Sequence, residues 1–341
     1  MAEDHRPGAV YWIDHYVSGT NDIERSERFY ESVLGTEARR ANGAALTAKE
    51  RENPHILFLW VTNSFHFGTC LQPQPLPAPR ELGREYPRYG YFIREAEIDD
   101  HLRRLDRNQV PHTDPIRTSE EGESGTAIYW QDPDGNQLEF WAPEHLPAGA
   151  MEGEGPLHMG RCSSVVLGCR DLARSVDFYS RWWGVDPIYS AEIPQDTAAL
   201  VLAGGGRVVL KQVDVLGQRT RGHTQWEVLH TALAVREDEF MPLYHRLWEA
   251  LPEWDYDPTI TRGSTEGEES LPARMGVHSD FDLPWKQAFG RGQTLYDWDT
   301  NACHFYPALP VDGSMVVYEA GDIRSYYQNG GQRPQPEATP S

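Results

Sequence analysis

His15 lies next to a repeated stretch of the chain, and the repeat makes its residue type informative. It stands seven residues before a fourteen-residue pattern, residues 22–35, which recurs as residues 171–184 with six of the fourteen positions identical. An imidazole binds metal ions and transfers protons near neutral pH. The offset of 149 residues between the copies places Ser164 at the position equivalent to His15. The two copies have therefore diverged at a residue that could do chemistry.

The repeat divides the chain into two related domains. A length of 341 residues favours the same number. We predict a first domain over residues 1–147, a linker rich in Gly, Pro and Glu over 148–158, and a second domain over 159–320. The second domain contains an insertion at about 252–300, expected to be either a substrate lid or a surface loop. A polar, Pro-rich tail over 321–341 is expected to be flexible.

Hydrophobic spacing predicts alternating strands and helices, in βαβββ-like units that recur along the chain. Helices are expected at 22–34, 98–105, 171–183 and 239–251. Strands are expected at 10–17, 55–61, 65–71, 89–93, 163–169, 198–202, 207–213 and 228–235, with hairpins at 127–141 and 303–319. The Asp-Pro-Asp-Gly sequence at 132–135 is a strong turn signal within the first hairpin. The pattern predicts an α+β fold.

Composition excludes several classes of partner. The chain has 31 Lys and Arg against 52 Asp and Glu, a formal net charge of -21, which disfavours nucleic acid and anionic membrane surfaces. It has no uninterrupted apolar stretch of about 18 residues, the length that a membrane-spanning helix needs. The four cysteines form no CxxC pair, and no signal-peptide pattern opens the sequence. These features favour a cytoplasmic protein.

Four elements in this order resemble the vicinal oxygen chelate superfamily, which includes glyoxalases, bleomycin- and fosfomycin-resistance proteins and extradiol ring-cleaving dioxygenases. They are His15 with the helix motif at 22–35, the hairpin ending at Glu139, the second helix motif, and the strand that begins at His230. The resemblance implies paired βαβββ units that form curved, mixed-sheet cups. It also implies a divalent metal held by a His or Gln from the first strand of one unit and a His and a Glu from the first and last strands of its partner.

Neither domain alone has a complete set of these ligands. In the first domain the implied positions hold His15, Tyr89 or Tyr91, and Glu139. In the second they hold Ser164, His230 and Val317, with Glu319 two residues further along the same strand. Units pair either within a domain or crosswise, first with fourth and second with third. Crosswise pairing would unite His15, His230 and Glu319 in one triad and leave Ser164, the tyrosines and Glu139 as a degenerate second site. We favour this arrangement.

Three further residues are expected to assist at the site. By the resemblance, His66 and His304 lie on strands that line or adjoin the cups, and Tyr129 matches the substrate-facing tyrosine of ring-cleaving relatives. Each could move a proton. The candidate residues also have ordinary structural interpretations. His15 and His230 would be satisfied core histidines, and Tyr129 would pack in its hairpin. Glu139 would face solvent, and Glu319 would be an ordinary carboxylate at a strand end.

The resemblance implies a metal-dependent oxidoreductase of the extradiol dioxygenase kind. Fe(II), or else Mn(II), would bind a catecholic or vicinal-diol substrate and admit dioxygen beside it. A glyoxalase-like isomerase or lyase, using Ni, Zn or Mn without oxygen, is the first alternative. A metal-free protein that sequesters a flat small molecule is the second. Self-association into a homo-oligomer stays open.

Overall fold

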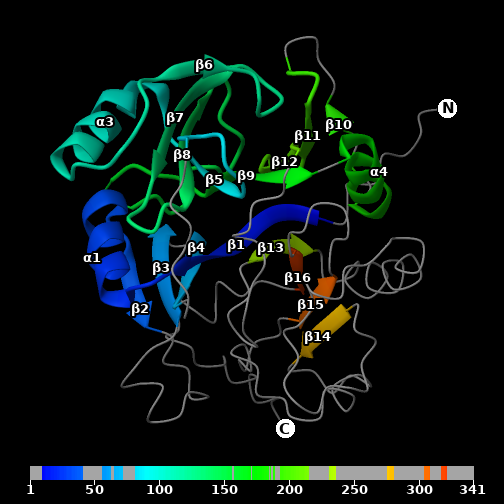
Figure 1. The fold of residues 1–341 in the computed structure, drawn as a ribbon, viewed down its shortest axis with the longest axis horizontal. Coiled ribbons are helices and arrows are strands. Elements are labelled where there is room, and N and C mark those ends of the chain that lie inside the picture. Colours follow the sequence, from blue (N-terminus) through cyan, green and yellow to red (C-terminus); the bar gives the residue numbers. More distant parts are fainter. Residues whose placement is uncertain are drawn as a thin grey trace, which may run out of the picture.

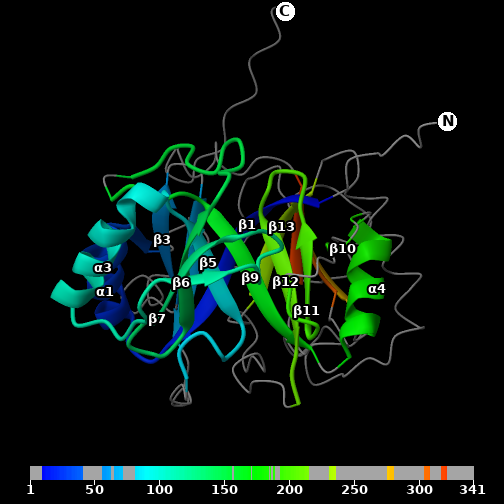
Figure 2. The same ribbon diagram turned by 90° about the horizontal axis from the view of Figure 1, so that it is seen from above.

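The fold consists of two eight-stranded sheets with helices at the two ends (Figure 1). It was obtained as a computed structural model. The structure describes residues 10–40, 56–62, 65–71, 81–155, 157–169, 171–183, 185, 187–188, 193–214, 230–235, 275–279, 303–307 and 316–320. Figure 2 shows α1 and α3 at one end of the molecule and α4 at the other, as Figure 1 does.

Four successive units supply the strands. The first holds β1 (Val10–Thr20), α1 (Ile23–Leu34), β2 (Glu37–Arg40), β3 (Ile56–Thr62) and β4 (Phe65–Leu71). The second holds β5 (Arg88–Phe92), the short helix η1 (Glu95–Glu97), α3 (Ile98–Arg107), β6 (Ile116–Thr118), β7 (Gly125–Gln131) and β8 (Gln137–Pro143). The third holds β9 (Cys162–Cys169), α4 (Leu172–Trp183), β10 (Pro187–Ile188), β11 (Thr197–Val201) and β12 (Arg207–Gln212). The fourth holds β13 (His230–Val235), β14 (Met275–Ser279), β15 (Cys303–Pro307) and β16 (Val316–Ala320).

The units pair crosswise. Sheet A has the order β14-β15-β16-β13-β1-β4-β3-β2 and so joins the fourth unit to the first. Sheet B has the order β10-β11-β12-β9-β5-β8-β7-β6 and joins the third unit to the second. In each sheet two first strands meet antiparallel at the centre, β1 with β13 and β5 with β9, while their outer neighbours β4, β16, β8 and β12 run parallel to them. The α+β class and the curved, mixed sheets are confirmed, and each unit finds its partner in the other half of the chain.

Aromatic side chains fill the core between the two sheets. Tyr16 of β1 stacks on Tyr89 of β5 with ring centroids 3.7 Å apart, and its hydroxyl bonds that of Tyr91. Phe65 and Phe67 of β4 surround the same ring. All five side chains are buried, so this cluster fixes sheet A against sheet B.

The repeated helix motif is explained by its ends and by one buried contact. Asp22 caps α1 by accepting a hydrogen bond from the backbone of Arg25, and Gly35 ends the helix with a φ of 61°. The hydroxyl of Tyr30 donates to Asp132 of the β7–β8 turn at 2.7 Å. The identical polar residues of the motif therefore dock the helix onto the next unit.

Most predicted elements are confirmed, and four strands were missed. Strands β2, β6 and β10 are short, two to four residues each, and carry little hydrophobic alternation. Strand β14 lies inside the predicted insertion at 252–300 and pairs with β15. The helix predicted at 239–251 and the tail at 321–341 lie outside the described residues. Within the described part, no helix is long and apolar enough to cross a membrane.

Candidate metal centre

Each sheet presents one row of residues that corresponds to the predicted ligand positions. In sheet A the backbone pairs His15 with Ala232, and Ala232 with Val317. In sheet B it pairs Ser164 with Gly90, and Gly90 with Glu139. We call the sheet face that carries His15 cup A, and the face that carries Ser164 and Glu139 cup B. The two rows are equivalent because β1 and β9 are repeats of each other.

His15 is held in a specific orientation in cup A. The side chain is fully buried, and its Nδ1 lies 2.9 Å from the Oδ2 of Asp14. Asp14 stands at a register shift in β1, where an extra residue bends the strand. The ring stacks on His66 of β4 with centroids 5.1 Å apart, and His66 stacks on Trp60 of β3 at 4.7 Å.

The Asp14 contact orients the imidazole of His15. An ionised carboxylate only accepts hydrogen bonds, so Nδ1 is the donor in this contact. Metal-binding histidines commonly donate their second ring N–H to a carboxylate in this way. Ser163 and Ser164 occupy the equivalent positions in cup B, and β9 has its register shift at the same place. The shift is therefore part of the repeat, whereas the Asp-His pair belongs to cup A alone.

The remaining predicted ligands of cup A are described by backbone register only. His230 of β13 pairs with Val17, two pairs along the ladder from His15 and so on the same face of the sheet. Such diagonal neighbours have Cα atoms about 7–8 Å apart, within reach of long side chains. Glu319 pairs with Ala234 on one side and with His304 of β15 on the other. The backbone thus brings His15 and His230 together and sets Glu319 two pairs beyond the row of His15, on the side away from His230.

Sheet B corrects the expected aromatic ligand position. Tyr89 and Tyr91 lie in the core between the sheets, stacked on or bonded to Tyr16. The position equivalent to His230 is held by Arg88, because Arg88 pairs with Val166 as His230 pairs with Val17. Sequence reasoning missed Arg88 because it lies just before the predicted strand, where alternation alone does not fix the register.

Arg88 is fully buried in cup B and bonds in three directions. Its Nε donates to Glu139 at 2.8 Å, its Nη2 to Glu120 at 2.9 Å, and its Nη1 to the carbonyl of Gly83 at 2.6 Å. The ring of Tyr129 lies 4.5 Å from the guanidinium carbon, so a cation–π contact covers one face. Burial opposes the charge, but Glu139, Tyr129 and Glu120 outweigh it and hold the pKa of Arg88 above its usual range. Tyr129 and Glu139 are therefore together, but in the cup that lacks His15.

The loop of residues 119–124 lies across cup B. Glu120 accepts a hydrogen bond from Lys211 at 2.9 Å as well as from Arg88, and these cations keep its pKa low despite burial. Glu123 bonds Arg207. Glu121 is fully buried, and burial together with nearby Glu139 raises its pKa to about 8. Burial also raises the pKa of Glu139, to about 7, against the opposing effect of Arg88.

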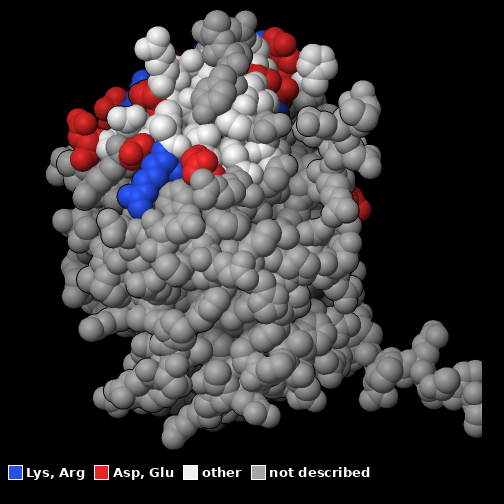
Figure 3. Space-filling model, turned by 90° about the vertical axis from the view of Figure 1, so that its right-hand side faces the viewer, with Lys and Arg blue, Asp and Glu red and all other residues white. Residues whose placement is uncertain are grey.

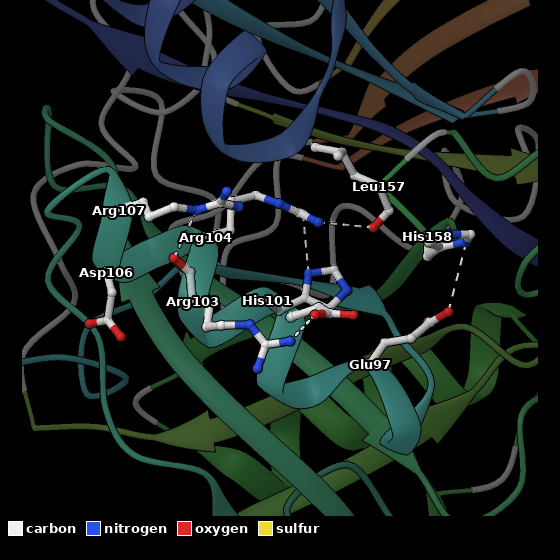
Figure 4. A pocket seen from close by; sticks show the side chains of 9 residues that line it. Glu97, His101, Arg103, Arg104, Asp106, Arg107, Leu157 and His158 are labelled. Carbon is white, nitrogen blue, oxygen red and sulfur yellow. Dashed lines mark hydrogen bonds and ion pairs between the residues drawn. The ribbon is translucent and has the colours of Figure 1, made fainter.

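A separate pocket of about 550 Å³ lies beside α3, away from both cups (Figure 4). His101, Arg104, Glu97 and His158 line it, and none of them was predicted as a site residue. Acidic and basic side chains are interspersed there, as they are on the described part of the face in Figure 3. Among the residues that the structure describes, no three His, Cys, Asp or Glu side chains group as a metal site.

Comparison with known proteins agrees with this geometry. Residues 12–140 match the family model of the Glyoxalase/Bleomycin resistance protein/Dioxygenase superfamily. Among solved structures, a putative dioxygenase from Bacillus subtilis subsp. subtilis strain 168 is 14% identical, with a TM-score of 0.60, over 94% of this chain and 90% of that one. Glyoxalase I from Zea mays is 14% identical, with a TM-score of 0.52, over 93% and 94%. No curated protein matches the chain.

The predicted relationship to the vicinal oxygen chelate superfamily is therefore confirmed. Residues 12–140 match the glyoxalase, bleomycin-resistance and dioxygenase superfamily by sequence, and the likeness to the two structures shows the same fold over nearly the whole chain. At 14% identity that likeness defines the fold and leaves the reaction to be argued from the site.

Proposed function

We propose that this protein is a metal-dependent oxidoreductase of the extradiol dioxygenase kind, with cup A as its active site. His15, His230 and Glu319 would be the metal ligands, Fe(II) the preferred metal, and a catecholic or vicinal-diol compound the substrate. The observation that carries the proposal is the buried His15, whose Nδ1 is engaged by Asp14. With Nδ1 donating to Asp14, Nε2 is the nitrogen that would bind the metal.

The donor set fits a divalent transition metal. Two imidazoles and one carboxylate are the ligands of non-haem Fe(II) oxygenases, and three protein ligands leave positions open for two substrate oxygens and for dioxygen. The bound metal would supply Lewis acidity and redox chemistry.

The protein's own residues would orient and deprotonate the substrate. Asp14 holds the tautomer of His15. His66, whose ring stacks 5.1 Å from that of His15, is near enough to the site to take a proton from a diol hydroxyl. His66 and Trp60 are 2% and 7% exposed, so bulk water has little access to this side of the cup. His304 pairs with Glu319 on the neighbouring strand and is the second candidate for proton transfer.

Metal analysis after anaerobic reconstitution tests the ligand set. We expect about one Fe(II) per chain, lost in His15→Ala and in His230→Ala. Asp14→Asn should weaken metal affinity about 10- to 100-fold, the usual cost of removing a ligand's supporting carboxylate. Ser163→Ala and Ser164→Ala, at the equivalent positions of cup B, are the matched controls and should keep the full metal content.

Oxygen uptake with a panel of catechols then tests the reaction. Uptake that depends on iron and on His15 supports the dioxygenase. Conversion of a 2-oxoaldehyde thiohemiacetal without oxygen would show that the protein is an isomerase. Tight binding of an aromatic compound without metal or turnover would show that it is a binding protein. If Glu319→Gln keeps its full metal content, Glu319 is not a metal ligand. The proposed oxygen-activating site would then lack its carboxylate and would be wrong.

A further inference from the structure

Cup B keeps the architecture of a metal cup but has a different residue at two of the three ligand positions. Ser164 stands where cup A has His15, and Arg88 stands where cup A has His230. Only Glu139, on the last strand of the second unit, retains the residue type that the superfamily uses for a metal.

The partner of Glu139 in cup B is Arg88. Glu139 is fully buried, and its Oε2 accepts a hydrogen bond from Arg88 Nε at 2.8 Å. We propose that cup B is a metal-independent cup, in which the guanidinium of Arg88 takes the place of the cation and Glu139 is its fixed counter-ion. Arginine suits this role because its planar fork stays charged and binds carboxylates in defined directions.

The loop of residues 119–124 supplies further carboxylates to the cations of cup B. Glu120 reaches both Arg88 and Lys211 at 2.9 Å, and Glu123 reaches Arg207. Arg88, Lys211 and Arg207 each contact a carboxylate of this loop, so the three cations of the cup are paired with acidic groups of the protein itself. A substrate in cup B would also have to displace this loop.

Close packing along the ligand row supports the same conclusion. A Cβ placed on Gly90, between Ser164 and Glu139 in the row, would lie 2.5 Å from the Ser164 hydroxyl and 2.4 Å from that of Ser163. Strands β5 and β9 therefore approach each other closely at Gly90, where only the serine hydroxyls fit between them. Tyr129 covers Arg88 from the side of β7. Arg88 and Glu139 are both fully buried by the protein's own side chains.

Cobalt titration of the full chain tests the proposal on a single substitution. Glu139→Gln removes the charge of the one ligand-type residue in the row and should bind as many Co²⁺ ions per chain as the unmodified protein. Loss of one cobalt per chain in Glu139→Gln would overturn the proposal. The comparison holds whatever number of ions cup A binds, so failure of the proposed function does not obscure it.

A gain-of-site variant tests the role of Arg88. The double substitution Ser164→His/Arg88→His recreates two histidines beside Glu139, and we expect one additional Co²⁺ per chain, with the visible absorption of a nitrogen- and oxygen-ligated ion and a raised Tm. Ser164→His alone keeps Arg88 and is the matched control, expected to gain no ion. An additional ion in that control would show that Arg88 does not exclude metal. If the double variant does not fold, the Glu139→Gln titration still decides.

Discussion

At the scale of single residues, three differences between equivalent strands separate the cups. Asp14 and His15 form a supported imidazole in β1, whereas β9 has two serines at these positions. Arg88 stands in β5 where β13 has His230. Because the backbone frame is shared, a change of side chain alone converts a potential ligand set into an internal ion pair.

His101 of α3 provides a prediction about pH. It is 1% exposed and packs on Phe140, and burial, with a smaller effect of Arg104, lowers its pKa to about 3. The unfolded chain binds this proton with a pKa near 6.5, so the stabilising contribution is complete above that value and is lost as the pH falls from 6.5 towards 3. From pH 8 to pH 5 the free energy of unfolding should fall by about 2 kcal/mol through this group.

Urea unfolding of the full chain and of His101→Gln at pH 8 and pH 5 measures this contribution. Between pH 8 and pH 5, the free energy of unfolding of His101→Gln should fall by about 2 kcal/mol less than that of the unmodified chain. At pH 8 the variant is expected to be less stable, because the packing of His101 is lost. Equal losses in the two proteins between pH 8 and pH 5 would assign the acid sensitivity to other groups.

At the scale of elements, the β7–β8 turn anchors a helix from another unit. Asp134 of this turn accepts hydrogen bonds from Thr20 Oγ1 at 2.9 Å and from the backbone of Asn21 at 3.0 Å, and it pairs with Arg25. The turn was predicted as a hairpin signal, and its aspartates prove to hold α1 against sheet B. The position of α1 therefore depends on the β7–β8 turn.

Substitution Asp134→Ala should therefore be costly. It removes the buried carboxylate that Thr20, Asn21 and Arg25 share, and we expect a loss of about 3 kcal/mol of stability. Denaturant unfolding measures the loss. Asp106→Ala is the control, because that carboxylate is 71% exposed in its pair with His112 and should cost about 0.5 kcal/mol. Similar values for the two variants would contradict the anchoring role.

At the scale of the whole molecule, the crosswise pairing makes each half incomplete. Strand β1 needs β13 and strand β5 needs β9, and each pair joins residues from opposite halves of the chain. Separated halves would expose two long central strands as open edges, which favours aggregation.

Dividing the chain within residues 148–158 tests this arrangement. We expect each half alone to be aggregated or unfolded, and the co-expressed halves to purify as one complex. Size-exclusion chromatography and far-ultraviolet circular dichroism distinguish these states. A first half that is monomeric and unfolds cooperatively by itself would show that pairing within the half is sufficient.

The sequence by itself determined the elements and their repetition. The motif at 22–35 and 171–184 predicted α1 and α4, because helical spacing and capping are local properties. The Asp-Pro-Asp-Gly turn likewise predicted the β7–β8 hairpin. Short edge strands such as β6 were missed because three residues carry too little periodicity.

Only the tertiary structure decided which residues share a cup. His15 and His230 are 215 positions apart, and their proximity follows from the antiparallel pairing of β1 with β13. The exchange of the expected tyrosine for Arg88 depends on a register that differs by one residue, which moves a side chain to the other face of the sheet. Local sequence cannot encode such choices, because they are fixed by contacts between strands far apart in the chain.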